Sequence, residues 1–172
     1  MYSNLSLIRW EGDLSNLTNG AEMFYDTRLT SFNADLSSLE NGTGMFAYCF
    51  TLPSFSSNLS SLTDGSCMFY GCTYLSSFTS DLSNLTHGSG MFNNCSNLTS
   101  FSSNLSSLTD GSSMFTYCSQ LTSFSSNLSS LTSGDHMFHL CSLDAPSVKN
   151  IALTINKNTS NARFDIGVDN SI

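Results

Sequence analysis

Apolar residues recur along this chain in one order that repeats every 22 or 23 positions. The order is L-x-x-F-x-x-x-L-x-x-L-x-x-G-x-x-M-F-x-x-C, with Trp10 in the Phe position of the first copy. Six copies cover residues 7–143 and start at Leu7, Leu29, Leu52, Leu75, Leu98 and Leu121. A fixed period over most of the chain is the sequence signature of a repeat architecture.

One copy is too short to bury its own apolar side chains, so we expect the copies to stack and to cover one another. In the fourth copy the predicted structural core consists of Leu75, Phe78, Leu82, Leu85, Met91, Phe92 and Cys95. The short Leu-Thr-Ser-Phe stretch of a copy predicts a strand, and stacked copies would place these strands in a parallel β-ladder. The predicted fold class is therefore a solenoid of six coils.

Turn residues follow each predicted strand at constant spacing. An Asp or Asn comes three residues after the Phe, as at Asp81, and its side chain can hydrogen-bond the backbone of the next turn. A later glycine, such as Gly88, predicts a turn with positive φ. After that glycine, Met, Phe, Cys and the next Leu are spaced i, i+1, i+4 and i+7, which predicts a short helical segment with these side chains on one face.

The template breaks after Cys141, and the remaining sequence predicts other elements. Apolar residues at helical spacing predict a helix over residues 145–156, with Pro146 in its first turn, where the missing N–H is harmless. Alternating apolar residues predict a strand over residues 162–168. These two elements would form a cover for the last coil.

We therefore divide the chain into a solenoid, residues 1–143, and a C-terminal helix–strand cap, residues 144–172. Residues 1–6 are too few to make a comparable cover at the other end. Leu7 and Trp10 are then poorly protected, so we expect either that the chain is a fragment or that it self-associates through its N-terminal end.

Charge narrows the range of partners. The formal net charge is -8 and charged residues make up 10%, against about 25% in a typical domain. Between Leu29 and Val148 there is no Lys or Arg, so nucleic acid and anionic membranes are poor partners. No apolar run approaches the roughly 20 residues of a membrane span, and the first residues do not resemble a secretory signal. We expect no membrane insertion.

The segment M-F-x-x-C-x-x-L-T-S-F, as at residues 91–101, resembles the BspA-like leucine-rich repeats of bacterial and protist surface proteins. A similar coil there reads A-F-x-x-C-x-x-L-x-x-I, so Met replaces the usual small residue before Phe. The resemblance covers all six copies. It implies a right-handed leucine-rich-repeat solenoid of 23-residue coils, used for adhesion or protein binding, and it brings no catalytic residues.

The cysteines of five copies share one template position: Cys49, Cys72, Cys95, Cys118 and Cys141. Neighbouring rungs of a ladder lie about 4.8 Å apart, which is within reach of a disulfide. Side chains stacked in parallel do not give the disulfide dihedral, however, so we predict a column of buried thiols that pack as small apolar groups. Cys67 lies outside this register, and we expect it to react first.

The sequence gives little support for metal binding or catalysis. His136, His139 and Cys141, beside Asp135, offer zinc donors but lack a fourth ligand. Asp135, His136 and the many serines suggest a hydrolase, but no G-x-S-x-G motif is present, and a triad needs fixed contacts. A column of Asp and Asn residues that includes Asp35 could hold calcium, but half of the column is uncharged Asn, and a ladder of turn-forming side chains explains it without an ion. We expect no enzyme activity, metal or cofactor.

Exposed positions of the template would carry recognition. A face of Ser and Thr flanks the strands, as at Ser76 and Ser77, and could hydrogen-bond a glycan or a protein. The candidate binding residues are the aromatic side chains between the Met-Phe pair and the next Leu, because such anchors dominate interface energies. They are Tyr25, Tyr48, Phe50, Tyr70, Tyr74 and Tyr117. Alternatively, these rings only shield the edge of the coil.

Two functions from different classes remain. The first is a non-catalytic adhesion or interaction module of a surface-exposed protein, which binds a protein or glycan on another cell or particle surface. The second is a structural subunit of a surface or phage-tail assembly, in which the solenoid contacts its own copies or neighbouring subunits. The first predicts an extracellular or cell-surface location.

Overall fold

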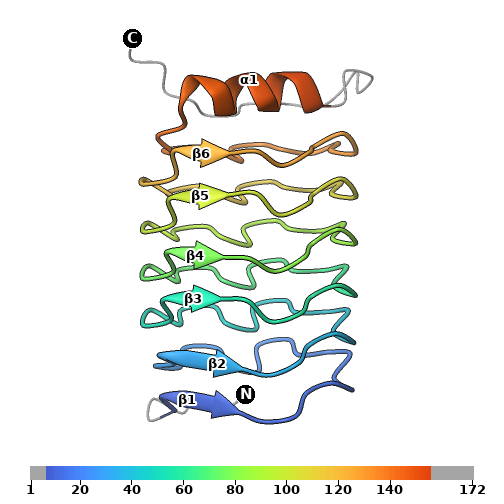
Figure 1. Ribbon diagram of the computed structural model, residues 1–172, viewed down its shortest axis with the longest axis vertical. Helices are drawn as coiled ribbons and strands as arrows, with labels where there is room; N and C mark the ends of the chain where they lie inside the picture. Colours follow the sequence, from blue (N-terminus) through green and yellow to red (C-terminus); the bar gives the residue numbers. More distant parts are fainter. Residues whose placement is uncertain (1–6, 156–172) are drawn as a thin grey trace.

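Each repeat contributes one short strand, and the strands lie one above the other along the long axis of the molecule (Figure 1). The structure, a computed structural model, describes residues 7–155. Its strands are β1 (Arg9–Glu11), β2 (Ser31–Asn33), β3 (Ser54–Phe55), β4 (Ser77–Phe78), β5 (Ser100–Phe101) and β6 (Ser123–Phe124). In β3 to β6 the serine is exposed and the phenylalanine is buried, so each strand directs one aromatic ring into the solenoid.

Parallel pairing keeps equivalent residues of neighbouring repeats in register. β3 pairs with β4 so that Phe55 lies opposite Phe78, and the pairs β1–β2 and β5–β6 follow the same rule. A second column of parallel bridges passes through all six coils. Its members are Asn19, Asn41, Asp64, His87, Asp110 and Ser133. The predicted leucine-rich-repeat solenoid with a parallel β-ladder is confirmed.

Two ladders of phenylalanine rings fill the core. The ring of Phe92 stacks on the rings of Phe69 and Phe115, with centroids 5.5 Å apart in both cases. The strand residue Phe78 meets Phe92 edge to face at 4.9 Å. Such aromatic pairs contribute about 0.5–1.5 kcal/mol each beyond the burial of their area. All seven core residues predicted for the fourth copy are buried, with at most 6% of any side chain exposed.

The helical segment predicted after each glycine is wrong. In the fourth coil the N–H of Met91 donates to Gly88 O, and that of Asn93 donates to Gly90 O, as in successive tight turns. Between them, the N–H of Phe92 donates to Met114 O of the next coil at 2.8 Å. Alternate N–H groups therefore link neighbouring coils, whereas a helix would keep all of them within one segment.

Two left-handed residues in each coil explain this departure from helix. Their φ angles lie between 53° and 72°, and left-handed residues cannot continue a right-handed helix. One such position precedes Met and holds Glu22, Gly44, Cys67, Gly90, Ser113 and His136. The other precedes the Cys position and holds Asp26, Tyr48, Gly71, Asn94, Tyr117 and Leu140. Most of these residues are not glycine, so composition gives no sign of the conformation.

The glycine that recurs at one position of the template allows close packing and does not have positive φ. The predicted positive φ at this position is therefore wrong. Gly88 and its five equivalents are absent from the residues with positive φ. A Cβ built on Gly65 would lie 3.0 Å from the Sδ of Met91 in the next coil and 3.2 Å from Leu62 Cδ2. Because Met91 is fully buried, a side chain at position 65 has no room. The glycine lets the next methionine approach the backbone.

The Asx turns predicted after the strands are confirmed. The N–H of Ser83 donates to Asp81 Oδ1 at 2.9 Å, and the N–H of Ser106 donates to Asn104 Oδ1 at 3.0 Å. The same bond occurs in every copy, irrespective of whether Asp or Asn is present. A turn that needs only one side-chain oxygen accepts either residue.

A helix, α1 (Ala145–Thr154), packs against the last strand (Figure 1). Its N-cap Asp144 accepts a hydrogen bond from the N–H of Ser147, and hydrogen bonding by Ser147 lowers the pKa of Asp144. The Ser147 hydroxyl oxygen in turn accepts a hydrogen bond from the N–H of Phe124 at 2.8 Å. The helix therefore provides a hydrogen-bond acceptor for a backbone N–H group of β6. The predicted helix over residues 145–156 is confirmed, with its end at Thr154. The strand predicted over residues 162–168 lies outside the described residues.

Candidate functional site

Four of the six predicted aromatic residues form one contiguous group on the turn side of the first three coils. We call Tyr25, Tyr48, Phe50 and Tyr70 the aromatic cluster. The ring of Tyr48 lies 5.5 Å from Tyr25, 5.3 Å from Tyr70 and 5.8 Å from Phe50, measured between centroids. The small buried Ala47 occupies the template position of Tyr25 and Tyr70, and Tyr48 bridges the two tyrosines from the next position. Burial and the neighbouring Tyr48 hydroxyl raise the pKa of Tyr70.

The other two predicted aromatic residues lie apart from this cluster. Tyr74 is 63% exposed and makes no ring contact within residues 7–155. Tyr117 is 51% exposed, and its ring faces that of His139 at 6.2 Å. The structure therefore gathers some of the predicted binding residues and separates others. Tyr117 lies two coils beyond Tyr70, whereas Tyr74 is in the coil of Tyr70 but at a different template position.

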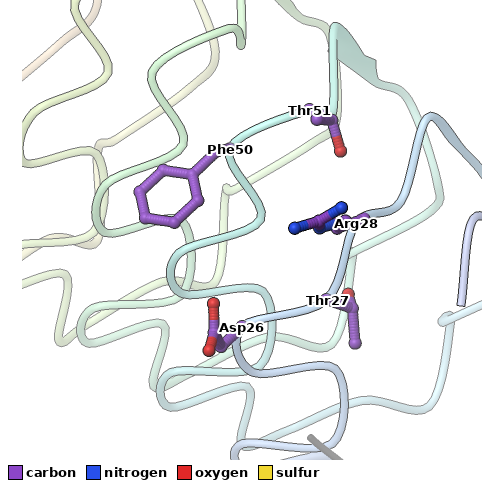
Figure 2. Close-up of a pocket in the computed structure, with 5 residues that line it drawn as sticks. All are labelled: Asp26, Thr27, Arg28, Phe50 and Thr51. Atoms are coloured by element: carbon purple, nitrogen blue, oxygen red, sulfur yellow. The ribbon is translucent and has the colours of Figure 1, made fainter. Parts of the chain in front are cut away.

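A small depression adjoins the aromatic cluster and shares Phe50 with it. It has a volume of about 150 Å³ and is lined by Asp26, Thr27, Arg28, Phe50 and Thr51. Figure 2 shows the Arg28 side chain extending toward the space between Phe50 and Asp26, with Thr51 on the same side as Arg28. The lining combines one cation, one carboxylate, two hydroxyls and the exposed face of a ring.

The depression lies where the repeat is one residue short. In the second coil two residues, Phe50 and Thr51, separate Cys49 from the next Leu, whereas in the first coil Arg28 is the only residue between Thr27 and Leu29. The missing residue accounts for the single 22-residue step. The sequence analysis did not single out Asp26, Thr27, Arg28 or Thr51. The irregular step and the isolated arginine were the available signals.

The polar groups of the depression differ in what they can still bind. The hydroxyl of Thr27 donates to Phe24 O at 2.9 Å, and that of Thr51 donates to Leu29 O at 2.9 Å, so both hydroxyl protons are used. Arg28 forms no ion pair within residues 7–155, where the ion pair present joins Arg9 to Glu11. Thr27 is buried and its oxygen also contacts Cys49 Sγ at 3.2 Å. Arg28 therefore offers free donors, while the exposed Thr51 oxygen offers an acceptor.

The hydroxyls beside the strands divide into two sets. Those at the strand entrance hold the coils together: Thr30 donates to Ile8 O, Ser76 to Pro53 O and Thr122 to Thr99 O. The serines within the strands are exposed, as Ser77 is. The predicted hydroxyl face is thus partly occupied by the fold's own hydrogen bonds.

The remaining chemical candidates do not assemble into a site. Within the described part of the chain, no three His, Cys, Asp or Glu side chains are grouped so that they could hold a metal ion. His136 and His139 lie with ring centroids 5.6 Å apart, but the thiol of Cys141 donates to Phe115 O at 3.1 Å. The zinc arrangement considered from the sequence therefore does not form there, because Cys141 faces the backbone of the preceding coil.

The cysteine column is buried, as its spacing predicts, although Cys141 at the end is only half-buried. Burial raises the pKa of Cys95 well above its usual value and that of Cys141 to about 12. Cys67 is the exposed cysteine. Partial burial and the carboxylate of Asp64 nevertheless raise its pKa, which lowers the fraction of reactive thiolate.

Comparison with known proteins decides the family. The profile of the BspA type leucine-rich repeat region matches residues 40–162 in six copies. The chain belongs to this family. BspA type repeats form interaction modules that are typically non-catalytic and generally surface-associated. No curated protein and no solved structure matched the chain. Within residues 7–155, no helix combines the length and the apolarity that crossing a membrane would require.

Proposed function

We propose that this BspA type solenoid is a non-catalytic binding module of a surface-exposed protein, and that it binds a protein or glycan on another cell or particle. The observation that carries the proposal is the aromatic cluster lying next to the depression. Tyr and Phe rings supply a large contact area at low entropic cost, and the depression adds a cation and acceptors that can orient a ligand. An extracellular location fits this role.

Binding can be tested with a glycan array and with pull-down from extracts of cell-surface proteins. The test variant is Tyr48→Ala with Tyr70→Ala, which removes the centre of the aromatic cluster. Tyr74→Ala is the matched control, because Tyr74 is an exposed tyrosine outside the cluster. We expect the double variant to lose the ligands that the wild type retains and the control to keep them. Equal binding by all three folded proteins would contradict the proposal.

A second candidate, a structural subunit, is favoured by the first coil. Ile8 is 58% exposed, and Leu7 and Leu14 are only partly buried. A second copy stacked on this coil would cover these side chains. Light scattering over a range of concentrations tests this alternative: growth in mass with concentration supports self-association, and a constant monomer mass contradicts it.

A further inference from the structure

Three departures from the repeat meet at the depression next to the aromatic cluster. The coil is one residue short there, as it is again at the end of the last copy, where Ser142 alone separates Cys141 from Leu143. Arg28 is the one cation between Arg9 and Lys149, and Phe50 stands where the later coils carry Thr73, Ser96, Ser119 and Ser142. Arg28 and Phe50 have no equivalent in the other coils and both line the depression, which makes it a candidate ligand site.

We infer that this depression binds a pyranose ring that carries a carboxylate, as in a uronic or sialic acid unit at the end of a glycan. The inference deepens the proposed function and rests on it. A volume of about 150 Å³ suits one six-membered ring, since an apolar protein cavity of that size binds benzene. A longer ligand would leave the depression and continue over the neighbouring coils.

The positive charge of Arg28 favours a ligand that carries a carboxylate. Arg28 has no ion pair within residues 7–155, and its planar guanidinium can bind a carboxylate through two parallel hydrogen bonds. The chain is acidic, with a net charge of -8, so an anion is attracted only where it meets a cation; besides Arg28 the described residues offer Arg9, which pairs with Glu11, and the exposed Lys149. At physiological ionic strength the Debye length is about 8 Å, so the charge of Arg28 attracts an anion only at short range.

The remaining lining suits a sugar ring better than a simple anion. Phe50 lines the depression and is 45% exposed, so its ring is accessible for packing against the apolar C–H face of a pyranose. The carboxylate of Asp26 and the hydroxyl oxygen of Thr51 can accept hydrogen bonds from sugar hydroxyls, because the Thr51 proton is already donated to Leu29 O. An acetate ion would use Arg28 and leave these groups unused.

The test is an NMR titration of the ¹⁵N-labelled chain with sodium methyl β-glucuronide and with the methyl glycoside of sialic acid. We expect saturable shifts of the Arg28 side chain and of the Thr51 amide, with a dissociation constant of about 1 mM for at least one of the two. Methyl β-glucoside, which lacks the carboxylate, and sodium acetate, which lacks the ring, should each bind at least about tenfold more weakly, because a hydrogen bond to a charged group is worth about 1.5–3 kcal/mol.

Two variants complete the test. Arg28→Gln removes the charge, and Phe50→Thr places at this position the residue that the third coil carries, so the fold should tolerate it. Both should lose the shifts, whereas Ser102→Ala, at an exposed position of the fifth coil, should keep them. Binding of the acidic sugars that survives Arg28→Gln, equal binding of the neutral glucoside, or the absence of shifts in the folded wild type would overturn the inference. Loss of partner binding in the Tyr48→Ala, Tyr70→Ala variant is a separate result, so the proposed function can stand if the sugar site fails.

Discussion

The thiol of Cys95 donates a hydrogen bond to the carbonyl oxygen of Phe69, one coil earlier, at 3.2 Å. The same oxygen accepts the N–H of Cys72 within its own coil at 3.1 Å. Cys72 repeats the relationship with Phe46, and Cys118 repeats it with Phe92, both at 3.1 Å. The cysteine column is therefore a series of donors that join successive coils, and each donor must keep its proton.

This relationship predicts that the protein loses stability in alkaline solution. Burial raises the pKa of Cys95 in the folded chain, so its contribution is complete below the unfolded pKa, 9.0, and is lost as the pH rises toward the folded value. Each such thiol lowers the free energy of unfolding by up to about 1.4 kcal/mol per pH unit in that range. Urea unfolding from pH 8 to pH 11 measures the decline, which Cys95→Ala should make shallower and Ser102→Ala should leave unchanged. A parallel decline in Cys95→Ala would contradict the role of the thiol.

Thiol accessibility predicts one reactive group in the native protein. Cys67 is exposed, whereas the five column cysteines are buried or half-buried. Its pKa is raised by partial burial and by Asp64, so the reaction rate should keep increasing with pH above the usual thiol range. Titration with a chromogenic disulfide should find about one fast thiol, none in Cys67→Ser, and all 6 after unfolding. Two or more fast thiols in the native chain would show that the column is open.

Core and surface positions of one coil should differ strongly. Phe92 is fully buried between the rings of Phe69 and Phe115, so Phe92→Ala should lower the free energy of unfolding by about 3–5 kcal/mol through the cavity that it leaves. Ser102 is exposed, and Ser102→Ala should change it by less than about 0.5 kcal/mol. Denaturant unfolding measures both values. Equal effects would show that the inside and outside of the coil are assigned incorrectly.

The left-handed positions predict a stabilising substitution. Ser113 has φ of 57°, and the equivalent positions of two other coils hold Gly44 and Gly90. Ser113→Gly should raise the free energy of unfolding by up to about 1 kcal/mol, because the left-handed strain of about 1–2 kcal/mol exceeds the entropic cost of glycine. The reverse change, Gly90→Ala, should lower it, since its Cβ would also lie 3.3 Å from Cys67 Sγ. If Ser113→Gly destabilises the protein, the turn conformation is not as described.

Period and side-chain chemistry were sufficient to predict the stacking of coils, the inward strand residue Phe78 and the Asx turn at Asp81. These features depend on side chains that recur in every copy. The backbone of the turn segment could not be predicted in this way. Its left-handed positions hold residues as different as Gly90 and Tyr117, because the inter-coil hydrogen bonds impose the conformation on whichever residue is present.

The candidate site was only partly predictable for a related reason. The repeat places Tyr48 and Tyr70 on neighbouring coils, so their contact follows from the register. The depression instead arises from a departure from the repeat, the missing residue beside Arg28, and a template that records what the copies share gives no weight to such a departure.

Successive repeats are joined coil to coil by backbone hydrogen bonds between their turn segments. Scalar couplings across hydrogen bonds, measured by long-range HNCO spectroscopy, detect each N–H and C=O partner directly. The structure predicts couplings from the amide of Phe46 to the carbonyl of Met68, and from Phe92 to Met114, whose donor–acceptor distances are both 2.8 Å. Couplings from these amides to carbonyls four residues earlier in the same repeat, as in a helix, would contradict the account.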